Sequence, residues 1–96
     1  MIKHTVFFKL RHAPGSAQEA GFIEVALGLS RIPEVRDLEC VRQVGKKTDF
    51  AWGLLMEFAT QADYGHYNNH PEHLKFVAEH WVPEVEKFVE LDYVAR

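Results

Sequence analysis

Apolar and polar positions alternate through the first strand-like segment of the chain, residues 2–11. Its even positions carry Ile2, His4, Val6, Phe8 and Leu10. This period of two is typical of a β-strand with one buried face, and His4 is the one polar residue on that face. Residues 50–59 carry large apolar side chains at every even position and mostly small or apolar ones between them. That pattern predicts a strand covered on both faces.

Turn and cap residues divide the rest of the chain into further elements. Ser16 and Glu19 have the spacing of a capping box and follow a Pro-Gly turn. Thr60 is a second N-cap candidate, and Pro71 fits the first position of a helix. The predicted order is a strand at 2–11, a helix at 17–30, strands at about 35–44 and 50–59, helices starting at Thr60 and Pro71, and a last strand near 89–94.

This βαββαβ order is the signature of a ferredoxin-like fold, so we expect an α+β domain with a four-stranded antiparallel sheet. The helices can cover only one face of that sheet. The other face carries Phe7 and Leu55 and needs a cover that a chain of 96 residues cannot supply. A second copy could supply it, and the pattern therefore predicts a homodimer of single-domain chains that each span residues 1–96.

Composition narrows the function further. The formal net charge is -3, the two signs are interspersed, and no basic cluster exceeds the pair Lys46-Lys47, which argues against nucleic-acid binding. No stretch approaches the roughly 18 apolar residues that a membrane span needs. Cys40 is the single cysteine, and the first residues lack the apolar run of a signal peptide. We therefore expect a cytoplasmic protein that does not act at a membrane.

The segment from Tyr67 to His73 concentrates the candidate chemistry. Pro71 predicts a helix start, which places His73 in the first helical turn. The positive end of the helix dipole disfavours imidazolium there, so a buried His73 would be neutral near pH 7 and able to accept a proton. Tyr67 could donate a hydrogen bond to a developing oxyanion. The structural alternative is that both residues only cap and pack the helix terminus.

Four histidines between positions 66 and 80 also suggest a metal site, but their spacing argues against one. The residues before Pro71 are biased away from helical geometry, so His66 and His70 do not share a helix face. His73 and His80 share a helix side, but no cysteine or suitably placed carboxylate joins them. No glycine-rich phosphate loop is present either. We expect neither a metal nor an organic cofactor.

Three segments resemble the stress-responsive A/B barrel (Dabb) family: residues 3–10, residues 52–58, and Tyr67 to His73 with its His-Pro-x-His run. The resemblance covers nearly the whole chain. It implies a ferredoxin-like protomer whose sheet pairs with that of a second copy in a dimeric α/β barrel, in agreement with the uncovered face described above. One plant member of the family is a polyketide cyclase, which closes a linear polyketide by intramolecular aldol condensation without metal or cofactor.

The resemblance to that cyclase implies catalytic roles for three residues of this chain. His73 corresponds to its basic histidine, Tyr67 to its catalytic tyrosine, and His4 to a pocket histidine on the first strand. The alternative for His4 is a core histidine bonded to a backbone carbonyl. A further pocket histidine of the cyclase is replaced by Trp52. Its indole would fill space that the cyclase leaves to substrate, so we do not expect the same substrate. The ligand pocket is expected to include Trp52, His70, Phe8 and Val77.

Three classes of function remain open at this point. The first is a cofactor-independent enzyme, a cyclase, isomerase or lyase acting beside a carbonyl of a small molecule. The second is a non-catalytic dimeric module that binds a small apolar ligand or contributes to stress tolerance. The third, by analogy with other dimeric α/β barrels, is a cofactor-free oxygenase or a haem-handling protein.

Overall fold

A computed structural model describes the whole chain, from Met1 to Arg96. The main elements are β1 (Ile2–Leu10), α1 (Ala17–Leu27), β2 (Arg36–Arg42), β3 (Trp52–Phe58), α2 (Gln61–Asn69), α3 (Pro71–Phe76), α4 (Val82–Glu84) and β4 (Val85–Tyr93). A 3-10 turn, Gly28–Arg31, extends α1, and a π-helical turn, Val77–Trp81, joins α3 to α4. This arrangement confirms the predicted βαββαβ order.

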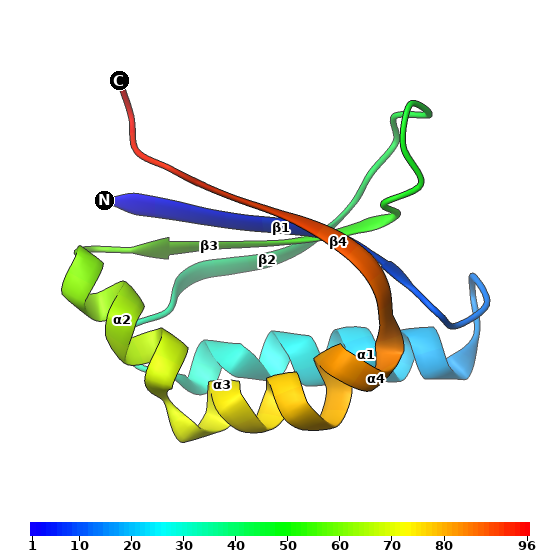
Figure 1. Cartoon of the computed structure of the whole chain (residues 1–96), viewed down its shortest axis with the longest axis horizontal. Coiled ribbons are helices and arrows are strands. Elements are labelled where there is room, and N and C mark those ends of the chain that lie inside the picture. The colour runs from blue at the N-terminus through cyan, green and yellow to red at the C-terminus, as the bar shows by residue number, and fades with distance from the viewer.

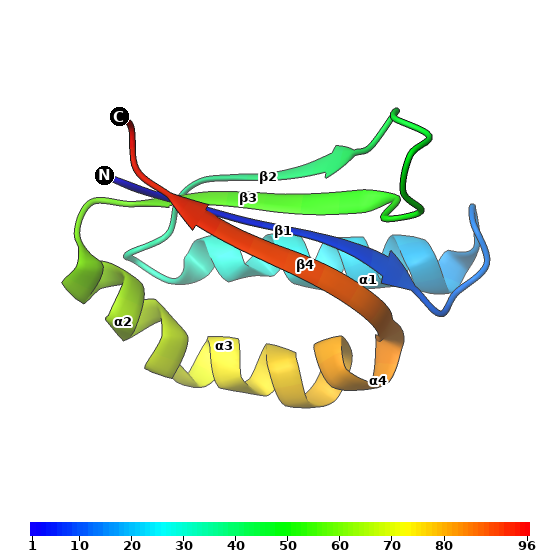
Figure 2. The same ribbon diagram turned by 45° about the horizontal axis from the view of Figure 1, so that its top comes forward.

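The four strands form one antiparallel sheet in the order β2-β3-β1-β4. The helices α1 and α3 run beneath one face of this sheet, and α2 closes one end of the layer (Figure 1). No helix lies on the opposite face, which both views leave open (Figure 2). We call the helix-covered side the inner face and the open side the outer face.

Local sequence signals set most of the element boundaries. The hydroxyl of Ser16 accepts a hydrogen bond from the backbone N–H of Glu19, and that of Thr60 accepts one from Asp63, each at 3.1 Å. Gly15 has a φ of 79°, the left-handed conformation that a Pro-Gly turn requires. Pro71 is the first residue of α3, where its missing N–H leaves no carbonyl unpaired. The predicted caps are therefore confirmed.

The last strand starts earlier than the sequence predicted. We expected it near residues 89–94, but β4 begins at Val85, which is buried and pairs with Leu10 of β1. The charged positions that follow Val85 are typical of an exposed helix turn, yet an edge strand tolerates them equally well because it faces solvent. The longer β4 consequently runs beside β1 over nearly its whole length.

The core lies between the inner face and the helices. Its fully buried large side chains are Phe8, Phe22, Phe58, Ile32 and Leu54. His4, 6% exposed, lies on the same face of β1 as Val6 and Phe8, as the alternation predicted. On the outer face, Phe7 and Leu55 are half-buried, while the β4 side chains there are exposed. The sheet is thus apolar on both sides but covered on only one.

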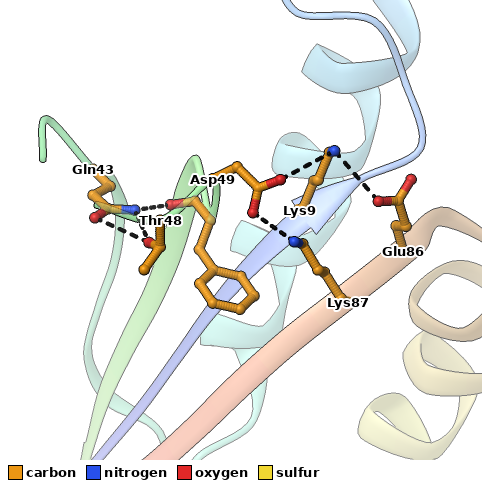
Figure 3. A network of polar contacts seen from close by, with 7 residues as sticks. Lys9, Gln43, Thr48, Asp49, Glu86 and Lys87 are labelled. Atoms are coloured by element: carbon orange, nitrogen blue, oxygen red, sulfur yellow. Dashed lines mark hydrogen bonds and ion pairs between the residues drawn. The ribbon is translucent and has the colours of Figure 1, made fainter. Parts of the chain in front are cut away.

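A polar network holds the β2–β3 loop against the start of β4 (Figure 3). The carboxylate of Asp49 accepts hydrogen bonds from the ammonium groups of Lys87, at 2.7 Å, and Lys9, at 3.2 Å. Lys9 also pairs with Glu86 at 3.4 Å. Gln43 bonds the hydroxyl of Thr48 and the carbonyl of Phe50 across the base of the same loop. The loop therefore closes one end of the outer face.

None of the helices has both the length and the apolar character needed to cross a bilayer.

Candidate functional site

A cavity of about 370 Å³ lies between the inner face of the sheet and the helices α2 and α3. This size falls in the range that small-molecule sites occupy. Most of its wall is apolar, and five residues with polar side chains lie on it. The lining residues are His4, Val6, Leu29, Leu54, Met56, Tyr67, Asn68, His73, Phe76, Val77, Trp81, Val82, Phe88 and Glu90. The three residues expected to be catalytic, His4, Tyr67 and His73, therefore border one space.

A hydrogen-bond network fixes the ring of His4 on one side. Its Nδ1 lies 2.6 Å from Oδ1 of Asp92 and 2.9 Å from the hydroxyl oxygen of Tyr64. Tyr64 in turn donates to Oδ2 of Asp92 at 2.8 Å, and burial, helped by this carboxylate, raises the pKa of the phenol. In the neutral imidazole, Nδ1–H donates to Asp92 and leaves Nε2 as an acceptor. Neither Tyr64 nor Asp92 borders the cavity, so the opposite edge of the ring faces it.

His73 is held in the same tautomer by a backbone group. Its Nδ1 lies 3.0 Å from the carbonyl oxygen of Asn68, which can only accept a hydrogen bond, so the proton resides on Nδ1. Burial lowers the pKa of His73, and the backbone hydrogen bond only partly offsets that effect. At neutral pH the imidazole is consequently uncharged and has a free lone pair on Nε2. These properties are those of a general base.

Tyr67 has the properties of a hydrogen-bond donor. Its side chain is almost fully buried, and its ring lies 4.3 Å from that of His73, measured between centroids. Burial, followed by the nearby Glu90 carboxylate, raises the pKa of Tyr67, so the phenol keeps its proton at neutral pH. The hydroxyl of Tyr67 has no hydrogen-bond partner in the protein. Every fully buried side-chain polar atom of the chain has such a partner, so this hydroxyl is not fully buried. The hydroxyl therefore opens to the cavity.

Trp52 does not line this cavity, and the prediction that it forms a wall is wrong. It lies opposite Phe8 at the start of β3, while the cavity lies toward the other end of β1. Its indole N–H donates to Glu19 at 3.0 Å, and the guanidinium of Arg42 lies 4.8 Å from its ring centroid. The even positions of β3 do share a face, but they are spread along the whole strand, and Trp52 is at the wrong end.

Two further residues expected in the pocket lie elsewhere. His70 accepts a hydrogen bond from the backbone N–H of Glu72 at 3.1 Å and caps α3. Phe8 is fully buried and packs against Phe22 and Trp81, with ring centroids 5.5 and 5.2 Å away. Both predictions of pocket lining are therefore wrong. Val77 does line the cavity, as expected.

Sequence analysis missed Tyr64, Glu90 and Asp92. The two acidic residues lie on the inner side of β4, where Glu90 is paired with Val6 and Asp92 with His4. The register of β4 against β1, which shifts between Lys9 and Leu10, places both on the face toward the helices. Tyr64 lies one helical turn before Tyr67, and this spacing was the available signal for a second inward-pointing phenol.

One group of side chains has the donor set for a metal ion. Ligand atoms of His4, Glu90 and Asp92 lie within 4.8 Å of one another. However, Nδ1 of His4 is already bonded to Asp92, and both carboxylates are exposed. The group fits hydrogen bonding within the protein at least as well as it fits metal coordination.

Comparisons with known proteins agree with this architecture. The family described as stress responsive A/B barrel domain (Dabb) matches residues 2–95. A Dabb protein with a ferredoxin-like fold from Mesorhizobium loti is 50% identical, with 99% of this chain and 96% of that chain covered and a TM-score of 0.98. No curated protein matches.

Two more distant structures show the fold alone. The hydroxynitrile lyase of Passiflora edulis is 24% identical, with 99% of this chain and 93% of that chain covered and a TM-score of 0.86. A dimeric ferredoxin-like protein of unknown function from Thermobifida fusca is 18% identical, with 98% of this chain and 90% of that chain covered and a TM-score of 0.81. The resemblance predicted from sequence is confirmed by the family match: this chain belongs to the stress responsive A/B barrel (Dabb) family.

Proposed function

We propose that the protein is a cofactor-independent enzyme that moves a proton beside a carbonyl group of a small molecule, as a lyase, isomerase or cyclase does. The observation that carries the proposal is the pairing of an uncharged His73 with the unpartnered hydroxyl of Tyr67 on one cavity wall. A base and an oxyanion donor are the two groups that such chemistry requires.

In the proposed mechanism, Nε2 of His73 takes a proton from a carbon or hydroxyl beside the reacting carbonyl. Negative charge develops on the substrate oxygen, and the hydroxyl of Tyr67 donates a hydrogen bond to it. Returning the proton from His73 to another atom completes an isomerisation or an aldol-type step. His4, held by Asp92, offers Nε2 as a second contact that orients the substrate. The Passiflora structural neighbour, a hydroxynitrile lyase, is compatible with this class of reaction.

We also propose that the working form is a homodimer in which the outer faces of two sheets pack together. Support comes from the apolar side chains on that face and from the dimeric state of structural neighbours such as the Thermobifida fusca protein. A homodimer also explains why the apolar side of β4, at Val89, Leu91 and Tyr93, points away from the helices of its own chain.

Proton abstraction can be tested without knowing the natural substrate. We expect the protein to accelerate exchange of the α-protons of 2-hydroxyacetophenone for deuterium in D₂O at neutral pD, followed by NMR. His73→Ala should slow this exchange by roughly two to four orders of magnitude, the usual contribution of a general base, and Tyr67→Phe should also slow it. Both variants should unfold at nearly the wild-type temperature, because Tyr67→Phe keeps the buried ring and His73 is only half-buried.

His66→Ala is the matched control, since His66 is exposed on α2 and does not border the cavity. It should exchange protons at the wild-type rate. Absence of exchange by the wild-type protein, combined with retention of an apolar ligand that mass spectrometry identifies, would replace the enzyme with the second candidate, a non-catalytic binding module. The predominantly apolar wall is the observation that keeps this candidate open. A loss of folding in both variants would return Tyr67 and His73 to a structural role.

A further inference from the structure

The carboxylates around the cavity have no lysine or arginine beside them in its wall. Glu90 is the only charged side chain among its lining residues, and neither lysine nor arginine is present. The Asp92 carboxylate lies beside it on the same face of β4, within the 4.8 Å group that includes His4. No cation pairs with Glu90. The negative charge of Glu90 helps to raise the pKa of Tyr67 in the cavity wall. Solvent screens part of the charge of the exposed Glu90, but an anionic ligand would still enter beside a carboxylate that has no cationic partner.

The hydrogen-bonding groups of the cavity include both acceptors and donors. Nε2 of His73 and the carboxylate of Glu90 can only accept. The hydroxyl of Tyr67 acts chiefly as a donor and the indole N–H of Trp81 can only donate, while Asn68 can do both. Leaving the desolvated Nε2 of His73 unpaired is costly, so a well-matched ligand brings a hydrogen of its own to this atom.

The aromatic part of the cavity wall favours a ligand with an apolar body. Phe76, Trp81 and Phe88 border the cavity, and the Trp81 and Phe88 rings meet edge to face with centroids 5.4 Å apart. Aromatic walls of this kind favour aryl groups by stacking and edge contacts, and they also bury alkyl chains. The polar residues border the same cavity, so one ligand can touch both kinds of wall.

We propose that the substrate is an uncharged molecule with an aryl or alkyl body and a hydroxyl group next to its carbonyl, and that Glu90 excludes carboxylates and phosphates. The carbonyl oxygen accepts from Tyr67, and the hydroxyl donates to a histidine Nε2 or to Glu90. This inference rests on the proposed function for its choice of cavity and carbonyl, and it adds the charge and hydrogen-bonding class of the ligand.

Three probes of similar shape separate these requirements. 2-Hydroxyacetophenone has the carbonyl and the hydroxyl, acetophenone lacks the hydroxyl, and phenylglyoxylate carries a carboxylate in its place. Binding is measured by titration, following the imidazole signals of His4 and His73 by NMR, so that no turnover is needed. We expect 2-hydroxyacetophenone to bind about fivefold to tenfold more tightly than acetophenone, as one hydrogen bond implies. Phenylglyoxylate should bind at least roughly tenfold more weakly than 2-hydroxyacetophenone.

Glu90→Gln tests the excluding residue directly. It should strengthen phenylglyoxylate binding by roughly tenfold while changing the affinity for uncharged acetophenone little. Glu24→Gln is the matched control, because it makes the same change of net charge on an exposed position of α1 away from the cavity. It should leave all three affinities unchanged.

Several results would overturn the inference. These are equal binding of phenylglyoxylate and 2-hydroxyacetophenone to the wild-type protein, equal effects of the two glutamate variants, or no shift of either histidine with 2-hydroxyacetophenone at millimolar concentration. A failure of the proposed function looks different. In that case the binding order would hold, but His73→Ala would exchange α-protons as fast as the wild-type protein.

Discussion

The two faces of the sheet use the same strands for different purposes. On the inner face of β1, Val6 and Phe8 are buried by helices of the same chain, and His4 is held by Asp92 at the cavity. On the outer face, Phe7 is half-buried and Leu91 of the adjacent β4 is 63% exposed, with no element of the chain above them. Apolar character alone therefore does not distinguish the buried face from the open face. What distinguishes them is whether the chain can supply the cover.

The largest expected effect on folding comes from the inner face. Phe8→Ala should lower the free energy of unfolding by about 3 to 5 kcal/mol, because the ring is fully buried against Phe22 and Trp81 and its removal leaves a cavity. Phe7→Ala, one residue earlier on the outer face, should cost clearly less, since that ring is only half-buried within one chain. Urea unfolding at one fixed protein concentration measures both. Equal losses would break the distinction between the faces.

The next effect concerns association. Leu91→Asp and Leu55→Asp should each raise the dimer dissociation constant by roughly two orders of magnitude, because each buries an unpaired carboxylate between the two outer faces. Sedimentation equilibrium at micromolar concentration is the measurement. Leu74→Asp is the control, since Leu74 is equally apolar and 53% exposed but lies on α3, on the helix side. A wild-type protein that sediments as a monomer would refute the homodimer proposal.

The sequence was a reliable guide where the signal is local. Ser16, Thr60 and Pro71 begin helices as predicted, because a cap or a fixed φ acts within one turn of the chain. Alternation also placed His4 on the correct face of β1. These signals depend only on residues a few positions away in the sequence, and a periodic pattern records relations of that range.

The sequence failed where the outcome depends on distance along the sheet or on partners far apart in the chain. Periodicity gave the face of Trp52 correctly but not its position along β3, and that position separates it from the cavity. Asp92 contacts His4 across 88 positions of sequence, so only the register of β4 against β1 identifies it as the residue that orients this ring. Charged residues on an edge strand carry no periodic signal of such a role.

A smaller effect is expected from Gly53, which lies opposite Phe7 on the outer face. A Cβ at this position would lie 2.5 Å from the ring of Phe7 on the outer face. Gly53→Ala should push that ring aside and weaken dimerisation, while the stability of each chain changes by only about 1 kcal/mol, since the ring is half-buried and alanine favours an ordered backbone. Gly21→Ala, in α1 with nothing near its Cβ, should leave association unchanged. If both variants dimerise as strongly as the wild-type protein, Phe7 lies outside the interface.

The smallest effect is a titration that belongs to the inner face alone. Because burial lowers the pKa of His73, its imidazole should titrate by NMR below the value of about 6.5 typical of an exposed histidine. The unfolded chain then binds more protons at this site than the folded chain between the two pKa values. The stability contribution is therefore complete above about pH 6.5 and is lost as the pH falls through that window. His73→Gln should remove this part of the pH dependence of unfolding. A midpoint at or above 6.5 would mean that the cavity does not desolvate the ring, and His73 would lose the property that makes it a base at neutral pH.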